Sequence, residues 1–141
     1  NDLQWNPMEP MNFCVANEDY KAYLFDMRKL DQPIKLYDGH ASAVMSLSWS
    51  PTGREFVTGS YDRTIRIFPM NDGKAREIYH TKRMQRVFCV NYTADNKYII
   101  SGSDDSNLRL WKARASEKLG QLTTREEASQ RYRSTLIKRH E

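Results

Sequence analysis

The sequence is poor in cysteine, and it lacks both a long apolar run and a glycine-rich phosphate loop. Its two cysteines have no further cysteine or histidine at metal-ligand spacing, which argues against a zinc site. No apolar run approaches the ~18 residues of a membrane-spanning helix, and no signal-peptide pattern is visible. No metal-ligand cluster or carboxylate pair stands out either. We therefore expect no cofactor, no metal ion and no membrane partner.

The two cysteines, Cys14 and Cys89, both lie in apolar runs with the pattern of strands. These surroundings predict that both thiols are buried and free. Free thiols fit a reducing compartment such as the cytosol or the nucleus.

Two windows of the chain repeat each other at an offset of 43 residues. Residues 57–68 match residues 100–111, so that Asp62 aligns with Asp105. A weaker third copy lies upstream, where Asp19 precedes Asp62 by the same offset. A period near 43 with short strands is typical of the blades of a WD-type β-propeller. The repeat favours an all-β, non-enzymatic scaffold over an enzyme.

Alternating apolar residues and turn residues predict the strands of these blades. The chain begins in a strand-like run at 3–5, and the expected strands that follow are 13–16, 22–25, 34–36, 44–49, 56–60, 65–68, 77–79, 87–92, 98–102 and 108–111. We expect the first blade to be partial and the last to lack an outer strand. A propeller closes with roughly 4–8 blades. The chain, with fewer than three, is therefore expected to be a fragment of a larger propeller of about seven blades. Its two open flanks should prevent it from folding alone as a monomer.

The positive charge of the chain lies at its C-terminal end. Residues 1–111, the expected blade region, carry 14 Lys or Arg and 14 Asp or Glu, whereas residues 112–141 carry 8 and 4. Residues 112–123 are expected to form an extended connector. A capping box beginning at Thr124 then predicts a helix, on which Ala128, Tyr132 and Leu136 form a narrow apolar stripe beside a basic face. The basic tail indicates an acidic partner such as nucleic acid; the alternative is a solvated helix with surplus arginine.

One set of polar residues occupies positions where WD blades keep a structural hydrogen-bond network. In the second blade the set is His40, Thr58, Asp62 and Phe68, and in the last blade it is Ser101, Asp105 and Trp111. Phe68 lacks the indole N–H of a tryptophan, and Arg83 stands where the last blade would need a histidine. Each network is therefore expected to lack one member. The same residues permit a weaker alternative, a hydrolase with Ser60, His40 and Asp62 as its triad, although no nucleophile elbow accompanies them.

The 81–86 loop is the most unusual connection, because it places three cations on a rim of the expected propeller, where such proteins bind their partners. The alternative is a solvated turn. The residues expected to contact RNA or an acidic partner are those of this loop and of the helix: Lys82, Arg83, Arg86, Arg125, Arg131, Arg133, Lys138 and Arg139.

Residues 81–86 and 98–117 closely resemble one family, and residues 25–28 and 39–45 also fit it. The chain is similar to the Sof-one-type WD-repeat proteins of the small-subunit processome, which are associated with the U-three small nucleolar ribonucleoprotein. In that family a basic, helical C-terminal region follows the last blade, as residues 112–141 do here. The resemblance implies a scaffold of the nucleus and nucleolus in assembly of the small ribosomal subunit. It would hold pre-ribosomal RNA, the small nucleolar RNA particle and other processome proteins.

Animal relatives in this family are linked to the cullin-four ubiquitin ligase as substrate receptors. Such receptors dock on the ligase adaptor through an aromatic-Asp-x-Arg sequence at the end of a blade strand. Residues 25–28 have this form with phenylalanine in the aromatic position, so Asp26 and Arg28 are the docking residues that the resemblance implies. Residues 111–114 are a poorer candidate, because Lys112 replaces the aspartate.

Overall fold

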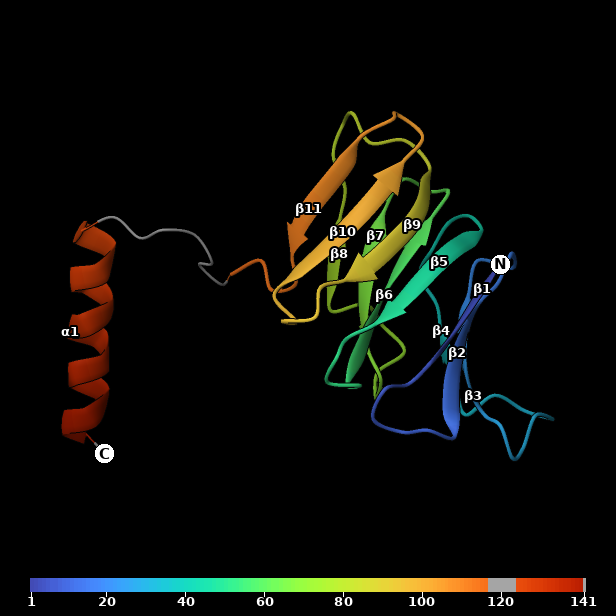
Figure 1. Cartoon of the computed structure of the whole chain (residues 1–141), viewed down its shortest axis with the longest axis horizontal. Coiled ribbons are helices and arrows are strands. Elements are labelled where there is room, and N and C mark those ends of the chain that lie inside the picture. The colour runs from blue at the N-terminus through green and yellow to red at the C-terminus, as the bar shows by residue number, and fades with distance from the viewer. Residues whose placement is uncertain (117–123, 141) are drawn as a thin grey trace.

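The computed structural model describes residues 1–116 and 124–140 of the chain (Figure 1). Within these residues the elements, in chain order, are β1 (Asp2–Trp5), β2 (Asn12–Ala16), β3 (Ala22–Asp26), β4 (Lys35–Tyr37), β5 (Val44–Trp49), β6 (Glu55–Ser60), β7 (Ile65–Pro69), β8 (Glu77–Tyr79), β9 (Val87–Tyr92), β10 (Tyr98–Ser103), β11 (Leu108–Lys112) and α1 (Thr124–His140). Figure 1 shows the strands gathered in neighbouring sheets, with α1 apart from them.

The strands form three antiparallel sheets, with the orders β1-β2-β3-β4, β5-β6-β7-β8 and β11-β10-β9. Each sheet is one blade, so the expected all-β, partial propeller is confirmed. The expectation of a partial first blade was wrong, because β1 pairs with β2 along its whole length and completes a four-stranded sheet. The third sheet has three strands within the described residues.

The turn between the second and third strands has the same backbone conformation in every blade. Tyr20, Arg63 and Ser106 all adopt a positive φ, of 74°, 67° and 66°, and they lie 43 residues apart. Gly53 and Asn96 lie in the turns between the first and second strands of the second and third blades. They are also 43 residues apart and have positive φ values of 69° and 61°. Non-glycine residues rarely adopt this left-handed conformation. Its recurrence shows that the weak upstream copy is a full structural repeat.

Neighbouring sheets bury apolar side chains between them, and successive residues of a strand point to opposite neighbours. In β7, Ile65 and Ile67 pack toward the third sheet, whereas Phe68 packs toward the first. The first interface also contains Tyr37 and Phe56, whose ring centroids are 4.7 Å apart in an edge-on contact. The second sheet is therefore buried on both faces, which explains why nearly every residue of β5 and β6 is buried.

The innermost strands β1, β5 and β9 are joined by bonds that cross from one blade to the next. In each case a side-chain oxygen on one inner strand accepts a hydrogen bond from a backbone amide of the following inner strand. The four bonds are Leu47 N to Asp2 Oδ2 (3.1 Å), Trp49 N to Gln4 Oε1 (3.4 Å), Val90 N to Ser46 Oγ (3.3 Å) and Tyr92 N to Ser48 Oγ (3.1 Å). The bonds fix the register of each blade against its predecessor.

The outward faces of the first and third sheets expose apolar side chains. On the first, Trp5 contacts Phe13 edge-on at 5.2 Å and remains half exposed. On the third, Leu108 and Leu110 are exposed. Cys14 is buried as expected, but Cys89 is exposed, so the expectation of two buried thiols was wrong. Cys89 lies on a strand of the third sheet, whose outward face no described strand covers.

Candidate functional site

His40, in the connection before β5, binds one residue of β6 and one residue of the turn between β6 and β7. Its Nδ1 donates to Asp62 Oδ2 at 3.0 Å, because a carboxylate can only accept. Its Nε2 is then free to accept from the hydroxyl of Thr58 at 2.6 Å. The imidazole and the Asp62 carboxylate are 2% and 8% exposed, so the network lies out of solvent. The structure thus brings together three of the four residues assigned to this blade's network.

The Asp62 carboxylate is the centre of this network. Besides His40, it accepts from the amide of Ala41 (3.0 Å) and from both the amide and the hydroxyl of Thr64 (3.0 and 2.6 Å). Burial by itself would raise the pKa of Asp62, but the hydrogen bonds from His40, Thr64 and Ala41 outweigh it and hold the pKa far below its usual value. Phe68 packs 6.2 Å from the imidazole, centroid to centroid, and has no N–H to donate.

The corresponding residues of the last blade are arranged differently. Trp111 Nε1 donates to Ser101 Oγ at 2.9 Å, which links the third strand to the second. Asp105 does not join this pair. It binds the guanidinium of Arg109 through both oxygens, and that contact lowers the pKa of Asp105 to about 2. Arg83, in the histidine position, is exposed. Grouping Asp105 with Ser101 and Trp111 was therefore wrong, because Asp105 binds Arg109, whereas Asp62 binds His40 in the second blade.

The hydrolase alternative has no geometric basis. Ser60 is fully buried, and its hydroxyl lies 3.0 Å and 2.8 Å from the carbonyls of Ser42 and Ala43. His40 Nε2 contacts Thr58 instead. Within the part of the chain that the structure describes, no serine is thus placed as a nucleophile beside this imidazole. Among the described residues no cluster of three or more His, Cys, Asp or Glu is placed to hold a metal ion. The one described helix is not long and apolar enough to cross a membrane.

Sequence reasoning missed a charged cluster that ties the second blade to the third. Arg76 binds Glu55 through Nε (3.0 Å) and Glu77 through its NH1 nitrogen (2.9 Å), and its NH2 nitrogen donates to the carbonyl of Ala113 (2.8 Å). Ala113 is buried, and the amide of Ala115 also contacts Glu77. The start of the expected connector is therefore fixed against two blades, whereas residues 117–123 of it lie outside the described residues. No repeat signal marks the cluster.

The cations of the 81–86 loop lie on the side of the blades that also carries the Asp62 turn. Lys82 and Arg83 are exposed, and no side-chain partner for either is present in the described part of the chain. Arg86 differs, because its guanidinium stacks over the ring of Tyr61 at 5.3 Å from the centroid. This contact gives Arg86 an aromatic partner, which Lys82 and Arg83 lack among the described residues.

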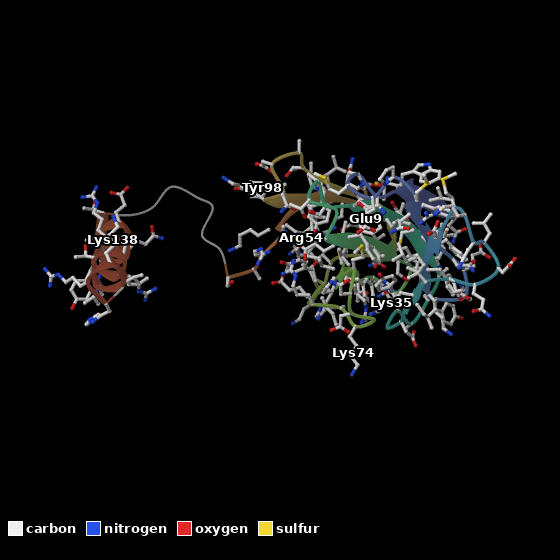
Figure 2. The ribbon with its side chains drawn as sticks, turned by 90° about the horizontal axis from the view of Figure 1, so that it is seen from below. Glu9, Lys35, Arg54, Lys74, Tyr98 and Lys138 are labelled. Carbon is white, nitrogen blue, oxygen red and sulfur yellow. The ribbon has the colours of Figure 1, made fainter. Side chains whose placement is uncertain are left out.

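Helix α1 exposes all of its assigned cations, and Figure 2 labels Lys138 on it. Arg125 lies three residues before Ala128, and Arg139 three residues after Leu136, so both fall along the apolar stripe. The cations therefore surround the helix and do not form one basic face. Tyr132 of the stripe is 67% exposed.

The residues assigned to adaptor docking form an ion pair at the end of β3. Arg28 contacts Asp26 with Nε (3.1 Å) and with its NH2 nitrogen (2.8 Å). The hydrogen bonds from the Arg28 side chain and amide lower the pKa of Asp26 to about 2. The Arg28 side chain is 68% exposed, so its guanidinium is presented to solvent. Arg28 therefore binds Asp26 with one side of its guanidinium, and the exposed remainder of the guanidinium is accessible to a partner.

The comparison with known proteins agrees with this architecture. The family described as WD domain, G-beta repeat matches residues 31–68 and 76–112. The chain is 57% identical over 139 residues to DDB1- and CUL4-associated factor 13 of Danio rerio, covering 99% of this chain and 31% of that protein. It is 55% identical over 139 residues to Protein SOF1 of Saccharomyces cerevisiae, covering 99% of this chain and 28% of that protein. The chain thus spans less than a third of the length of these relatives. It belongs to the WD-repeat family, and its sequence is similar to the SOF1-type members.

Proposed function

We propose that the chain is part of a non-enzymatic scaffold that binds pre-ribosomal RNA and assembly factors during formation of the small ribosomal subunit in the nucleolus. The proposal rests on the similarity to Protein SOF1 and on the resemblance to its family. The observation that carries it is the exposure of the cations on α1 and on the 81–86 loop, on a chain whose blade region is neutral. In this proposal residues 1–111 form the scaffold and residues 112–141 begin a separate basic region.

The proposal assigns most of the electrostatic contact with RNA to helix α1. Each cation that neutralises a phosphate releases a counterion, so binding weakens with salt in proportion to the number of contacts. The five assigned cations of α1 would together contribute about 3–4 to the slope of log affinity against log salt, at ~0.7 for each contact with single-stranded RNA. Deleting residues 112–141 would also remove the buried Ala113. Side-chain replacement is therefore the cleaner change.

Replacing the five assigned cations of α1 by glutamine should reduce the magnitude of this slope by about 3. The measurement is the affinity of the full-length protein for pre-ribosomal RNA across a salt series. The control replaces five exposed cations of the blade region, with the same change in net charge: Arg28, Lys29, Arg54, Lys74 and Lys97. The control should keep the slope. An equal reduction in both variants would assign the effect to overall charge and not to α1.

A second function is supported by the exposed Arg28 and by the name of the relatives, which associates them with DDB1 and CUL4. In this alternative the chain belongs to a substrate receptor of a cullin-four ligase, and the Asp26–Arg28 pair docks on the adaptor. The bidentate ion pair would orient the guanidinium toward the adaptor.

Replacing Arg28 by alanine should abolish binding to the DDB1 adaptor, and replacing Asp26 should weaken it because the guanidinium loses its support. The test is a pull-down of purified full-length protein with DDB1. Arg54→Ala is the matched control, since Arg54 is also an exposed arginine beside a turn. Retention of the adaptor at the wild-type level by Arg28→Ala would remove this docking site.

A further inference from the structure

An open groove of about 750 Å³ lies between the first and second sheets. Asp38 and Gly39, which follow β4, form one side, and Arg66 on β7 with Ile78 on β8 forms the other. The 72–75 loop closes one end, and Figure 2 shows Lys74 extending from that loop into solvent. Both sheets that border the groove have four strands within this chain, so both of its walls belong to this chain. Among the described residues, the outward faces of the first and third sheets have no such second wall.

Arg66 lies in this groove without a counterion. Its repeat equivalent, Arg109, is bound by both oxygens of Asp105. In the second blade the equivalent carboxylate, Asp62, is already occupied by His40 and Thr64. Within the described residues the Arg66 guanidinium has no hydrogen-bond partner, and its Nε is shielded from solvent. The guanidinium therefore has no carboxylate partner among the described residues, and its terminal nitrogens can accept an anion.

The absence of a side chain at Gly39 leaves room for the guanidinium. A Cβ at Gly39 would lie 2.8 Å from the NH1 nitrogen of Arg66, so any side chain at this position would displace the guanidinium. Gly39 has a φ of 140°, which side chains rarely adopt. The two terminal nitrogens stay reachable from the groove, whereas Nε is enclosed. They can bind the two oxygens of a carboxylate in parallel.

We propose that this groove binds an acidic side chain of an extended peptide segment from a partner protein, with Arg66 as the residue that receives the carboxylate. Asp38 and Asp72 border the same groove and are exposed. Their carboxylates would repel the continuous negative charge of an RNA backbone, but they can accept the backbone N–H groups of a peptide. Half-exposed Ile78 offers an apolar contact beside the charge. Lys74 at the mouth adds attraction for a single carboxylate.

The test uses immobilised full-length protein and two pools of fluorescein-labelled decapeptides. One pool has a fixed central glutamate with randomised flanks, and the other has glutamine at that position. The glutamate pool should be retained at least ten-fold more strongly than the glutamine pool. Arg66→Gln should remove the difference. Arg63→Gln, an exposed arginine three residues away with the same charge change, should keep it.

Two further variants distinguish a loss of peptide binding from a loss of folding. Lys74→Glu changes an exposed side chain at the mouth and should reduce retention of the glutamate pool several-fold without altering the melting temperature. Arg66→Lys keeps the charge but loses the paired donors, and should recover only part of the binding. Equal retention of the two pools by the wild-type protein would overturn the proposal. So would displacement of the glutamate pool by a 12-nucleotide uridine RNA that binds the wild type but not Arg66→Gln, since the groove would then be a phosphate site.

Discussion

Replacing Arg76 with methionine should lower the free energy of unfolding by about 3 kcal/mol, because it leaves an unpaired charge on Glu55 between two blades. Arg76 is 25% exposed and Glu55 11%, so water can compensate this loss only in part. The bond from Arg76 to the Ala113 carbonyl disappears as well, which releases the segment after β11. Chemical denaturation of the full-length protein measures the effect.

Two variants separate the charge effect from loss of packing. Adding Glu55→Leu to Arg76→Met removes the Glu55 charge together with its partner and should recover most of the lost stability, because the remaining Glu77 is 23% exposed and water can reach it. Arg28→Met breaks a similar bidentate pair, but at an arginine that is 68% exposed, and should leave the melting temperature unchanged. Equal melting temperatures for Arg76→Met and Arg28→Met would show that the cluster does not join the blades.

Replacing Asp62 with alanine should destabilise the full-length protein by roughly 1–3 kcal/mol, since it leaves the His40 Nδ1 and two backbone amides without an acceptor. Asp72→Ala is the matched control. Asp72 also accepts the amide two residues ahead, from Lys74, but it lies in an exposed loop. Its replacement should change stability by no more than about 0.5 kcal/mol. Thermal melts that coincide for the two variants would contradict the assigned role of Asp62.

The stabilising effect of Asp62 should also depend on pH in a defined direction. Its pKa in the folded protein lies far below the value of about 4 for an unfolded aspartate. The carboxylate therefore stabilises the fold fully above pH ~4, and this contribution is lost as the pH falls toward the folded pKa. The difference in stability between wild type and Asp62→Asn should shrink on going from pH 7 to pH 3. A difference that grows toward acid pH would contradict this linkage.

The repeated parts of the fold could be predicted well from the sequence. The expected strands 44–49, 77–79 and 87–92 coincide with β5, β8 and β9. Alternation and turn residues encode such strands locally, so no knowledge of distant contacts is needed. The first blade was underestimated because its copy of the repeat is weak, although Tyr20 repeats the left-handed turn of Arg63.

The parts that could not be predicted depend on contacts between blades. Arg76 meets Glu55 and Ala113, which lie 21 and 37 residues away and have no counterpart at the repeat offset. Asp105 binds Arg109 in a blade with Arg83 at the histidine position, and the sequence alone does not say which residue binds Asp105 there. The sequence does not reveal that Arg66 lacks a carboxylate partner, because this depends on Asp62 being bound to His40 and Thr64 in the fold.

The hydrogen bonds between the inner strands have a direction that bears on how the protein is synthesised. Two amides of β5, those of Leu47 and Trp49, and two of β9, those of Val90 and Tyr92, donate to side chains of the inner strand one blade earlier. A chain that leaves the ribosome from its N-terminus therefore presents the acceptors of one blade before the donors of the next emerge. Each new blade can dock on a finished template, so the order of translation and the order of assembly coincide, and a pause between blades leaves these four amides either already bound or not yet made.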